Sequence, residues 1–252
     1  MPKLILLGTA SAISNARHEN THMLLVGEER TILIDTASNP LPRLEAAGVD
    51  PERVSDVILT HFHPDHVSGF PLLLMNMWLM GRRAPLTVHG LHYTLDRIEV
   101  MLGLYGWSEW PNFFPVSFQP LPLEEKMLVL ECSECVVHAS PVKHFIPGIG
   151  LRFDFPLLGK ALAYSSDTEP CPQVVKLANG VDVLIHEASG ALPGHSSALQ
   201  AADIARQAGA RELLLIHYPA TISAHADLVA EACQVFPGPV QLAEDLQVLS
   251  FE

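Results

Sequence analysis

Positive charge is scarce in this sequence. Its 252 residues include 15 Lys and Arg against 28 Asp and Glu, which gives a formal net charge of −13. Proteins that hold nucleic acid through its phosphates usually present a basic surface. The average composition therefore argues against a long nucleic acid as the partner of this chain.

A hydrophobic run long enough to cross a membrane is also missing. The longest apolar run, Phe70 to Met80, contains Pro71 and Asn76 and is shorter than the ~20 residues that a membrane-spanning helix needs. The first residues, Met1 to Leu7, are too few for the apolar core of a signal peptide and predict a strand instead. We therefore expect no membrane association and a cytoplasmic location.

Cysteine is rare, with four residues at positions 132, 135, 171 and 233. Cys132 and Cys135 have the spacing of a metal-binding or redox pair, but no second pair accompanies them. A disulfide framework or a zinc site built from cysteines would need further partners. We expect reduced thiols without a role in function.

The remaining composition is that of a globular protein, with 48% hydrophobic and 17% charged residues. The length fits one domain at the upper end of the usual size range, so we expect a single domain over residues 1–252. Apolar strands that end in polar residues alternate with helical segments along the chain. This alternation is typical of an α/β protein in which helices cover the sheets.

Histidine and aspartate concentrate in one short stretch, Thr60-His61-Phe62-His63-Pro64-Asp65-His66, directly after the apolar run Val54 to Leu59. The run predicts a buried strand. Two histidines that are two residues apart project to the same side of a strand end and can chelate one ion, whereas Asp65 and His66 face a neighbouring position. Imidazole nitrogens and carboxylate oxygens suit zinc and similar divalent ions.

Further residues that could bind a metal or move a proton stand at the ends of other predicted strands or before a helix. Most of these residues directly follow a predicted strand. His195 instead precedes a helix predicted over 198–208, with Ser196 or Ser197 as its N-cap. These candidates are Asp35, His144, Asp167, Glu187, His195 and His217.

The stretch 61–66 resembles the signature of the metallo-β-lactamase-fold hydrolases, which are mostly dinuclear metal enzymes. That resemblance implies a metallo-β-lactamase-like αββα four-layer sandwich. The C-terminal half is similar to ribonuclease Z in particular. The stretches that carry this second resemblance are Gly159 to Thr168, Ala178 to Ala188, Gly194 to Ser197, Leu213 to His217, and Phe236-Pro with Ala243-Glu-Asp.

The resemblance implies two divalent metal ions, which we expect to be zinc, with manganese or iron also compatible. One ion would be held by His61, His63 and His144, the other by Asp65, His66 and His217, with Asp167 as the bridge. The resemblance also implies that Glu187 and His195 form an acid–base pair and that Asp35 orients a metal-bound histidine. Asp65 is in addition a candidate for accepting the proton of the attacking water.

Two departures from ribonuclease Z concern its grip on tRNA. The family carries a long arm, rich in Gly, Pro and basic residues, where this chain has only Leu151 to Gly159. The family also follows its last histidine with Ser and an Arg-Tyr pair, whereas His217 is followed here by Tyr-Pro-Ala-Thr. The sequence thus keeps the expected catalytic centre and argues against tRNA as a partner.

These features predict a dinuclear metal-dependent phosphodiesterase of ribonuclease Z-like type that acts on a small diester. Three alternatives remain: tRNA 3′-end processing without the arm, hydrolysis of thioesters or lactones, and a non-catalytic metal-binding or sensor protein. The pair Glu187 and His195 argues against the last alternative, because metal storage needs no acid. The aromatic-rich stretch 105–118 predicts core or a subunit interface, and hence allows a homodimer.

Overall fold

The computed structural model describes residues 1–220 and 225–251 and consists of two β-sheets that face each other. The first sheet has the strand order β14 (Val248–Ser250), β1 (Lys3–Gly8), β2 (His22–Val26), β3 (Thr31–Ile34), β4 (Asp56–Leu59), β5 (Leu86–Leu91), β6 (Val116–Leu121). The second has the order β13 (Val240–Leu242), β12 (Glu212–Ile216), β11 (Val183–Glu187), β10 (Lys160–Tyr164), β9 (Ile149–Phe155), β8 (Val136–Pro141), β7 (Met127–Glu131).

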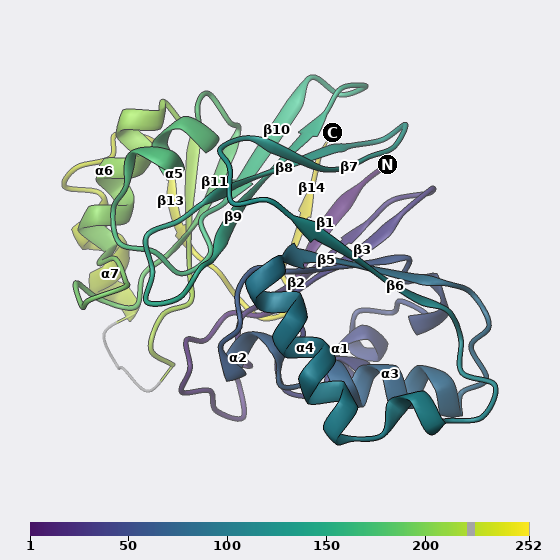
Figure 1. The fold of residues 1–252 in the computed structure, drawn as a ribbon. Coiled ribbons are helices and arrows are strands. Elements are labelled where there is room, and N and C mark those ends of the chain that lie inside the picture. The colour runs from purple at the N-terminus through teal and green to yellow at the C-terminus, as the bar shows by residue number, and fades with distance from the viewer. Residues whose placement is uncertain (221–224, 252) are drawn as a thin grey trace.

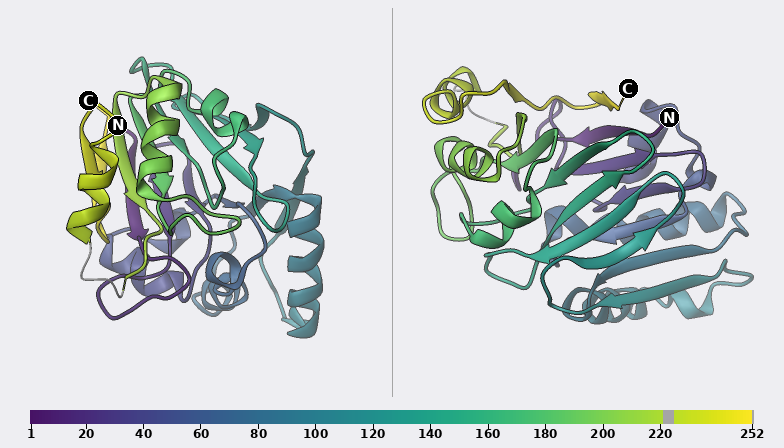
Figure 2. Two further views of the ribbon diagram at one scale, coloured as in Figure 1. Left: turned by 90° about the vertical axis from the view of Figure 1, so that its left-hand side faces the viewer. Right: turned by 90° about the horizontal axis from the view of Figure 1, so that it is seen from above.

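Helices cover the outer face of each sheet (Figure 1). The first sheet carries α1 (Pro40–Ala46), α2 (Pro64–Val67), α3 (Phe70–Leu79) and α4 (His92–Leu104), together with the short 3₁₀ helices η1 (Pro51–Arg53) and η2 (Trp107–Glu109). The second sheet carries α5 (Pro172–Leu177), α6 (Ala198–Ala208) and α7 (His225–Ala232). Figure 2 shows the two sets of helices on opposite sides of the paired sheets. The predicted four-layer αββα sandwich is therefore confirmed.

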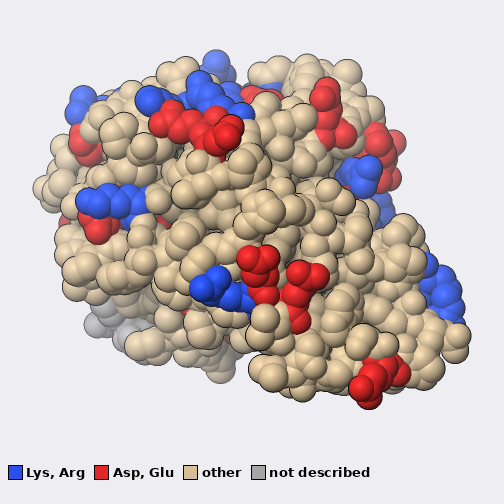
Figure 3. Space-filling model, in the orientation of Figure 1, with Lys and Arg blue, Asp and Glu red and all other residues tan. Residues whose placement is uncertain are grey.

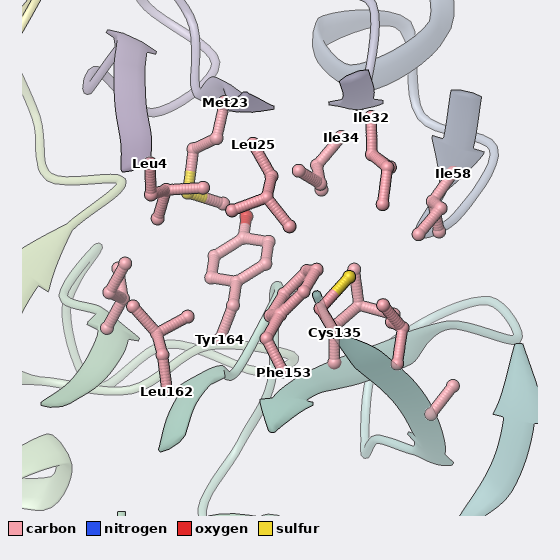
Figure 4. Packing of buried hydrophobic residues seen from close by; sticks show 14 of the residues in the cluster. Leu4, Met23, Leu25, Ile32, Ile34, Ile58, Cys135, Phe153, Leu162 and Tyr164 are labelled. Carbon is pink, nitrogen blue, oxygen red and sulfur yellow. The ribbon is translucent and has the colours of Figure 1, made fainter. Parts of the chain in front are cut away.

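Three hydrophobic clusters separate the four layers. The central cluster lies between the sheets, where Leu25 and Ile58 of the first sheet face Phe153 and Tyr164 of the second (Figure 4). A second cluster packs the first sheet against α3 and α4, and a third packs the second sheet against α5 and α6. Strands buried on both faces explain the nearly continuous apolar runs in the sequence.

Most predicted elements are confirmed, but two expectations were wrong. The stretch Val67 to Met80, with apolar residues all round, predicts one helix, but the structure has two, α2 and α3, separated by Ser68 and Gly69. The pattern of the segment 116–137 predicts mostly antiparallel strands, yet β6 pairs parallel with β5 at the edge of the first sheet. β7 then starts the second sheet, where it pairs antiparallel with β8. Short apolar runs do not reveal which sheet a strand will join.

The aromatic-rich stretch 105–118 packs against α3 and α4, as expected for core residues. Trp110 stacks on Trp78 with ring centroids 5.1 Å apart, and Phe114 is buried. Leu104 and Tyr105, at the end of α4, remain exposed. The homodimer stays a prediction. None of the helices in the described part of the chain has the length and apolar character that crossing a bilayer requires.

The break between α2 and α3 results from a close approach of two backbone segments. The amide of Gly69 donates to the carbonyl of Thr36 over 2.8 Å, and a Cβ atom at residue 69 would lie 2.2 Å from the carbonyl oxygen of Ser38. Only a residue without a side chain fits there. The contact ties α2 to the end of β3, which positions both segments for the site described below.

We expect Gly69→Ala to lower the free energy of unfolding by about 1–3 kcal/mol, because the added methyl group has to displace backbone. Gly103→Ala in α4 is the matched control, since a Cβ there meets no atom within 4 Å. Alanine is the better helix former, so the control should gain up to ~1 kcal/mol. Urea unfolding in the presence of a chelator measures the free energy of unfolding of both variants and the wild type. Equal values for Gly69→Ala and Gly103→Ala would contradict the close-packing explanation.

Candidate metal centre

The ten residues singled out from the sequence meet at one edge of the sandwich. The strands β10, β11 and β12 run parallel, so their carboxyl ends lie side by side, and the end of β4 reaches the same edge. The backbone amide of Ile149 donates to the carbonyl of Thr60 over 3.1 Å and joins the two sheets there. The residues brought together are Asp35, His61, His63, Asp65, His66, His144, Asp167, Glu187, His195 and His217.

Three imidazole nitrogens converge in the first of two clusters. His63 Nδ1 lies 3.1 Å from His61 Nε2 and 3.0 Å from His144 Nε2, and Asp167 Oδ2 lies 3.9 Å from His61 Nε2. Ligand atoms about 2.0–2.1 Å from a shared zinc ion are separated by about 2.9–3.4 Å. The nitrogen separations therefore match the edges of a coordination shell.

Hydrogen bonds on the outer side of this cluster fix which nitrogens carry protons. Thr60 Oγ1 uses its only hydrogen to donate to Asp35 Oδ2, at 2.8 Å, so it accepts from His61 Nδ1, at 3.0 Å. His144 Nδ1 donates to the carbonyl of Gly194 over 2.7 Å. The Nε2 atoms of both histidines consequently present lone pairs toward His63, which is the tautomer that a metal ligand needs.

The second cluster contains Asp65, His66, Asp167 and His217. His66 Nε2 lies 3.6 Å from both Asp65 Oδ2 and Asp167 Oδ1, and His217 Nε2 lies 3.4 Å from Asp65 Oδ2. The outer nitrogens are again engaged. His66 Nδ1 donates to Asp35 Oδ2 over 2.8 Å, and His217 Nδ1 donates over 2.8 Å to Ser189 Oγ, which itself donates to the carbonyl of His217.

Two buried atoms of the second cluster have no hydrogen-bond partner, namely His66 Nε2 and Asp167 Oδ1. Leaving such groups unpaired in the interior is costly, so native proteins rarely do so. A divalent cation at this point would satisfy both. Because Asp167 directs Oδ2 toward the first cluster and Oδ1 toward the second, the residues present fit a pair of ions with a shared carboxylate. Mixed nitrogen and oxygen donors accept zinc, manganese or iron without sharp preference.

The electrostatics of the centre also favour bound cations. Burial lowers the pKa of His61 well below its usual value, and burial lowers the pKa of His144 too, so both imidazoles stay neutral. Burial alone would raise the pKa of Asp167, yet His217 and His66 hold it well below the usual range. Burial likewise opposes charge on His66, but Asp167 and Asp35 raise its pKa well above the usual value. The carboxylates thus favour a positive charge at this point.

Glu187 and His195 lie beside the two clusters. The buried carboxylate of Glu187 accepts four N–H groups: the amides of Thr168, Ser189 and Ser196 and Nδ1 of His195, the last at 3.1 Å. The bond from Glu187 raises the pKa of His195. His195 Nδ1 lies 3.9 Å from Asp167 Oδ2, and the His195 side chain is 20% exposed.

Strained backbone accompanies the centre. Asp35, Ser166 and His217 adopt φ values of 60°, 54° and 52°, a left-handed conformation that non-glycine residues seldom adopt. Each follows a strand, β3, β10 or β12, and the turn redirects the chain at the cluster. Strain of this kind persists where surrounding contacts hold it, which is common at functional sites.

Sequence reasoning missed the residues that orient the ligands, apart from Asp35. Thr60 holds His61, Ser189 holds His217, and the carbonyl of Gly194 holds His144. Thr60 stands next to the histidine motif and could have been considered. Ser189 and Gly194 carry no pattern that links them to residues 28 and 50 positions away. His89, in contrast, forms a hydrogen bond with Asp56 away from the centre, and His92 is exposed.

The fold together with this arrangement of ligands defines a metal-dependent hydrolase of the metallo-β-lactamase fold, in the branch related to ribonuclease Z. The metallo-β-lactamase-fold protein YhfI from Bacillus subtilis superimposes with a TM-score of 0.84 at 22% identity, covering 98% of both chains. Human tRNase Z, short form, gives a TM-score of 0.79 at 24% identity over 99% of both chains. Ribonuclease Z of Methanothermobacter thermautotrophicus is 27% identical and aligns over 99% of this chain and 96% of its own.

The chain belongs to the family described as anti-Pycsar protein Apyc1, whose model matches residues 2–235. The alignment with the archaeal ribonuclease Z runs over 297 positions, more than the 252 residues of this chain. The relative therefore contains inserted sequence that this chain lacks.

We expect protein purified without chelator to contain two divalent ions per chain. His63→Ala removes a donor from the first cluster only and should leave about one ion, whereas Asp167→Ala removes the shared carboxylate and should lower the content of both. The exposed His92→Ala is the control and should retain two. Elemental analysis measures the ratios, and a value near zero in metal-loaded wild type would refute the metal centre.

Proposed function

We propose that this protein is a dinuclear metal-dependent phosphodiesterase that acts on a small diester, with zinc as the metal. The observation that carries the proposal is the position of Asp167, which faces both ligand clusters while lying 3.9 Å from His195. Two cation sites around one shared carboxylate suit an in-line displacement at phosphorus, and a nearby acid can protonate the leaving group. Relatives named ribonuclease Z support phosphodiester chemistry over thioester or lactone chemistry.

Bound divalent ions would lower the pKa of a water molecule and polarise the phosphoryl oxygens. Asp65 supports the nucleophilic side of the reaction. Its carboxylate is partly exposed, and although burial alone would raise its pKa, the neighbouring His217 and His66 lower it, so the group stays ionised. An ionised carboxylate beside the attacking water is the form that can accept its proton.

His195 acts on the leaving group. An alkoxide is a poor leaving group and benefits from a proton as the bond to phosphorus breaks. Glu187 accepts the Nδ1 proton of His195, which raises the pKa of the imidazole and turns Nε2 toward the substrate side. We assign Glu187 the positioning of His195, and His195 the transfer of the proton.

Three features support a small diester rather than tRNA. The interval that carries the arm in ribonuclease Z is here the hairpin of β9 and β10, joined by residues 156–159. On the face in Figure 3, the described Lys and Arg side chains occur in small groups next to Asp and Glu and form no extended basic patch. The net charge of −13 leaves few Lys and Arg side chains to hold a phosphate backbone.

A substrate panel tests the proposal. Metal-loaded protein is incubated with bis(4-nitrophenyl) phosphate, a thioester, a lactone and a precursor tRNA, and chelator-treated protein is the control. We expect turnover of the phosphodiester and weak or absent cleavage of the tRNA, because the chain lacks the arm. Efficient, salt-sensitive tRNA cleavage would move the function to 3′-end processing, and turnover of only the thioester or lactone would overturn the phosphodiesterase assignment.

The acid role of His195 predicts a dependence on the leaving group. A nitrophenolate departs unaided, so His195→Ala should keep its metals and much of its activity on bis(4-nitrophenyl) phosphate. On a dialkyl diester the same variant should lose on the order of 10²–10⁴-fold, the usual contribution of a general acid. Equal losses on both substrates, or loss of metal, would remove His195 from this role.

A further inference from the structure

The residue that follows the metal-cluster histidine His144 is an exposed aromatic, Phe145. It lies in the loop between β8 and β9 and is 66% exposed. Its ring centroid is 5.3 Å from that of His144 and 6.3 Å from that of His195. A large apolar ring therefore stands in solvent beside both the first ligand cluster and the proposed acid.

The ring of Phe145 is supported from one side by backbone. Gly194 leaves room for it, since a Cβ atom there would lie 2.7 Å from Cε2 of the ring. Gly194 adopts φ +77°, which other residues rarely adopt, and it is buried. Its amide donates to Glu169 Oε1 over 3.0 Å, and Glu169 in turn forms an ion pair with Lys143 at 2.6 Å. Gly194, which lies against the ring, is thus held in place by its hydrogen bond to Glu169, and Glu169 is held by Lys143.

Few charged side chains near Phe145 are available to bind the group that is attached to the phosphate of a substrate. Lys143 is the neighbouring cation in the same loop, and its ammonium is paired with Glu169. The loop that leads to His195 adds another exposed apolar side chain, Leu192, at 61% exposure. The chain as a whole has a net charge of −13. The exposed side chains Phe145 and Leu192 therefore favour apolar contact with a substituent next to the phosphate.

We propose that Phe145 is a specificity-determining residue that stacks on a planar aromatic group, such as a nucleobase, attached close to the scissile phosphate. The proposal rests on the proposed phosphodiesterase function and adds a preference for aromatic substituents. Gly194 lies against ring atoms Cδ2 and Cε2, while 66% of the residue is exposed, which leaves the ring accessible to a bound group. An aromatic ring can stack on any nucleobase, because every base has a π-face, and this stacking adds binding free energy without base-specific hydrogen bonds.

Two matched substrates isolate the stacking contribution. Adenosine 5′-(methyl phosphate) and methyl ribofuranoside 5-(methyl phosphate) share the diester and the sugar and differ in the base. Phe145→Ala should lower kcat/KM for the adenosine compound by about 5- to 150-fold, mostly through KM, as expected when stacking is lost. The same variant should leave the rate for the riboside unchanged. Phosphorus NMR follows both reactions.

Two further variants separate stacking from general hydrophobicity. Phe145→Trp should retain the preference for the adenosine compound, and Phe145→Leu should lose it although it keeps an apolar side chain. Metal content should remain unchanged in every variant. Equal effects of Phe145→Ala on both substrates, or full preference in Phe145→Leu, would overturn the proposal.

A binding measurement distinguishes failure of this inference from failure of the proposed function. In calorimetry, metal-loaded wild type should bind adenosine 5′-monophosphate more tightly than ribose 5-phosphate, and Phe145→Ala should bind both alike. If the protein hydrolyses neither diester but shows this difference, the stacking role stands and the phosphodiesterase function falls. If the protein hydrolyses both diesters at rates that do not depend on Phe145, the phosphodiesterase function stands and the stacking role falls.

Discussion

Lone pairs that face one another in a protein interior repel unless a cation lies between them, and the centre of this protein is built from such lone pairs. Nε2 of His61 and Nε2 of His144 point at His63, while Nε2 of His66 and Oδ1 of Asp167 are buried without a partner. A proton on His63 or His66 relieves only part of this crowding, because the outer nitrogens of His61, His144 and His217 are already committed as donors. Much of the remaining structure serves to hold this unfavourable arrangement in place.

The support comes from both sheets. Asp35, at the end of β3, accepts from Thr60 and from His66 and so sets the orientation of one ligand in each cluster. Ser189 and the carbonyl of Gly194, which follow β11, do the same for His217 and His144. Strained turns at Asp35 and His217 persist because these bonds hold them. The interior packing therefore stabilises a site that would be costly on its own.

Specificity has a different origin from the chemistry. The ligand set and the pair Glu187–His195 follow the ribonuclease Z-like pattern, whereas the hairpin of β9 and β10 occupies the place of the tRNA-binding arm. Beside the centre, Lys143 is paired with Glu169, and the contact that we propose for the substrate is the exposed ring of Phe145 next to Gly194. The same catalytic arrangement can therefore serve a much smaller substrate.

In the sequence by itself, apolar runs that end in polar residues indicated an α/β protein and placed candidate residues at strand ends. The resemblance carried by the motif at 61–66 and the C-terminal stretches supplied the four-layer sandwich and the grouping of the ten candidates. Sequence reasoning missed the split between α2 and α3 and the parallel pairing of β6, since a close backbone contact at Gly69 and the choice of sheet depend on residues far away in the chain. Tertiary structure alone decided which nitrogen of each histidine is free. Thr60, Ser189 and Gly194 fix those tautomers through hydrogen bonds, most of which join distant residues and leave no periodic signal in the sequence.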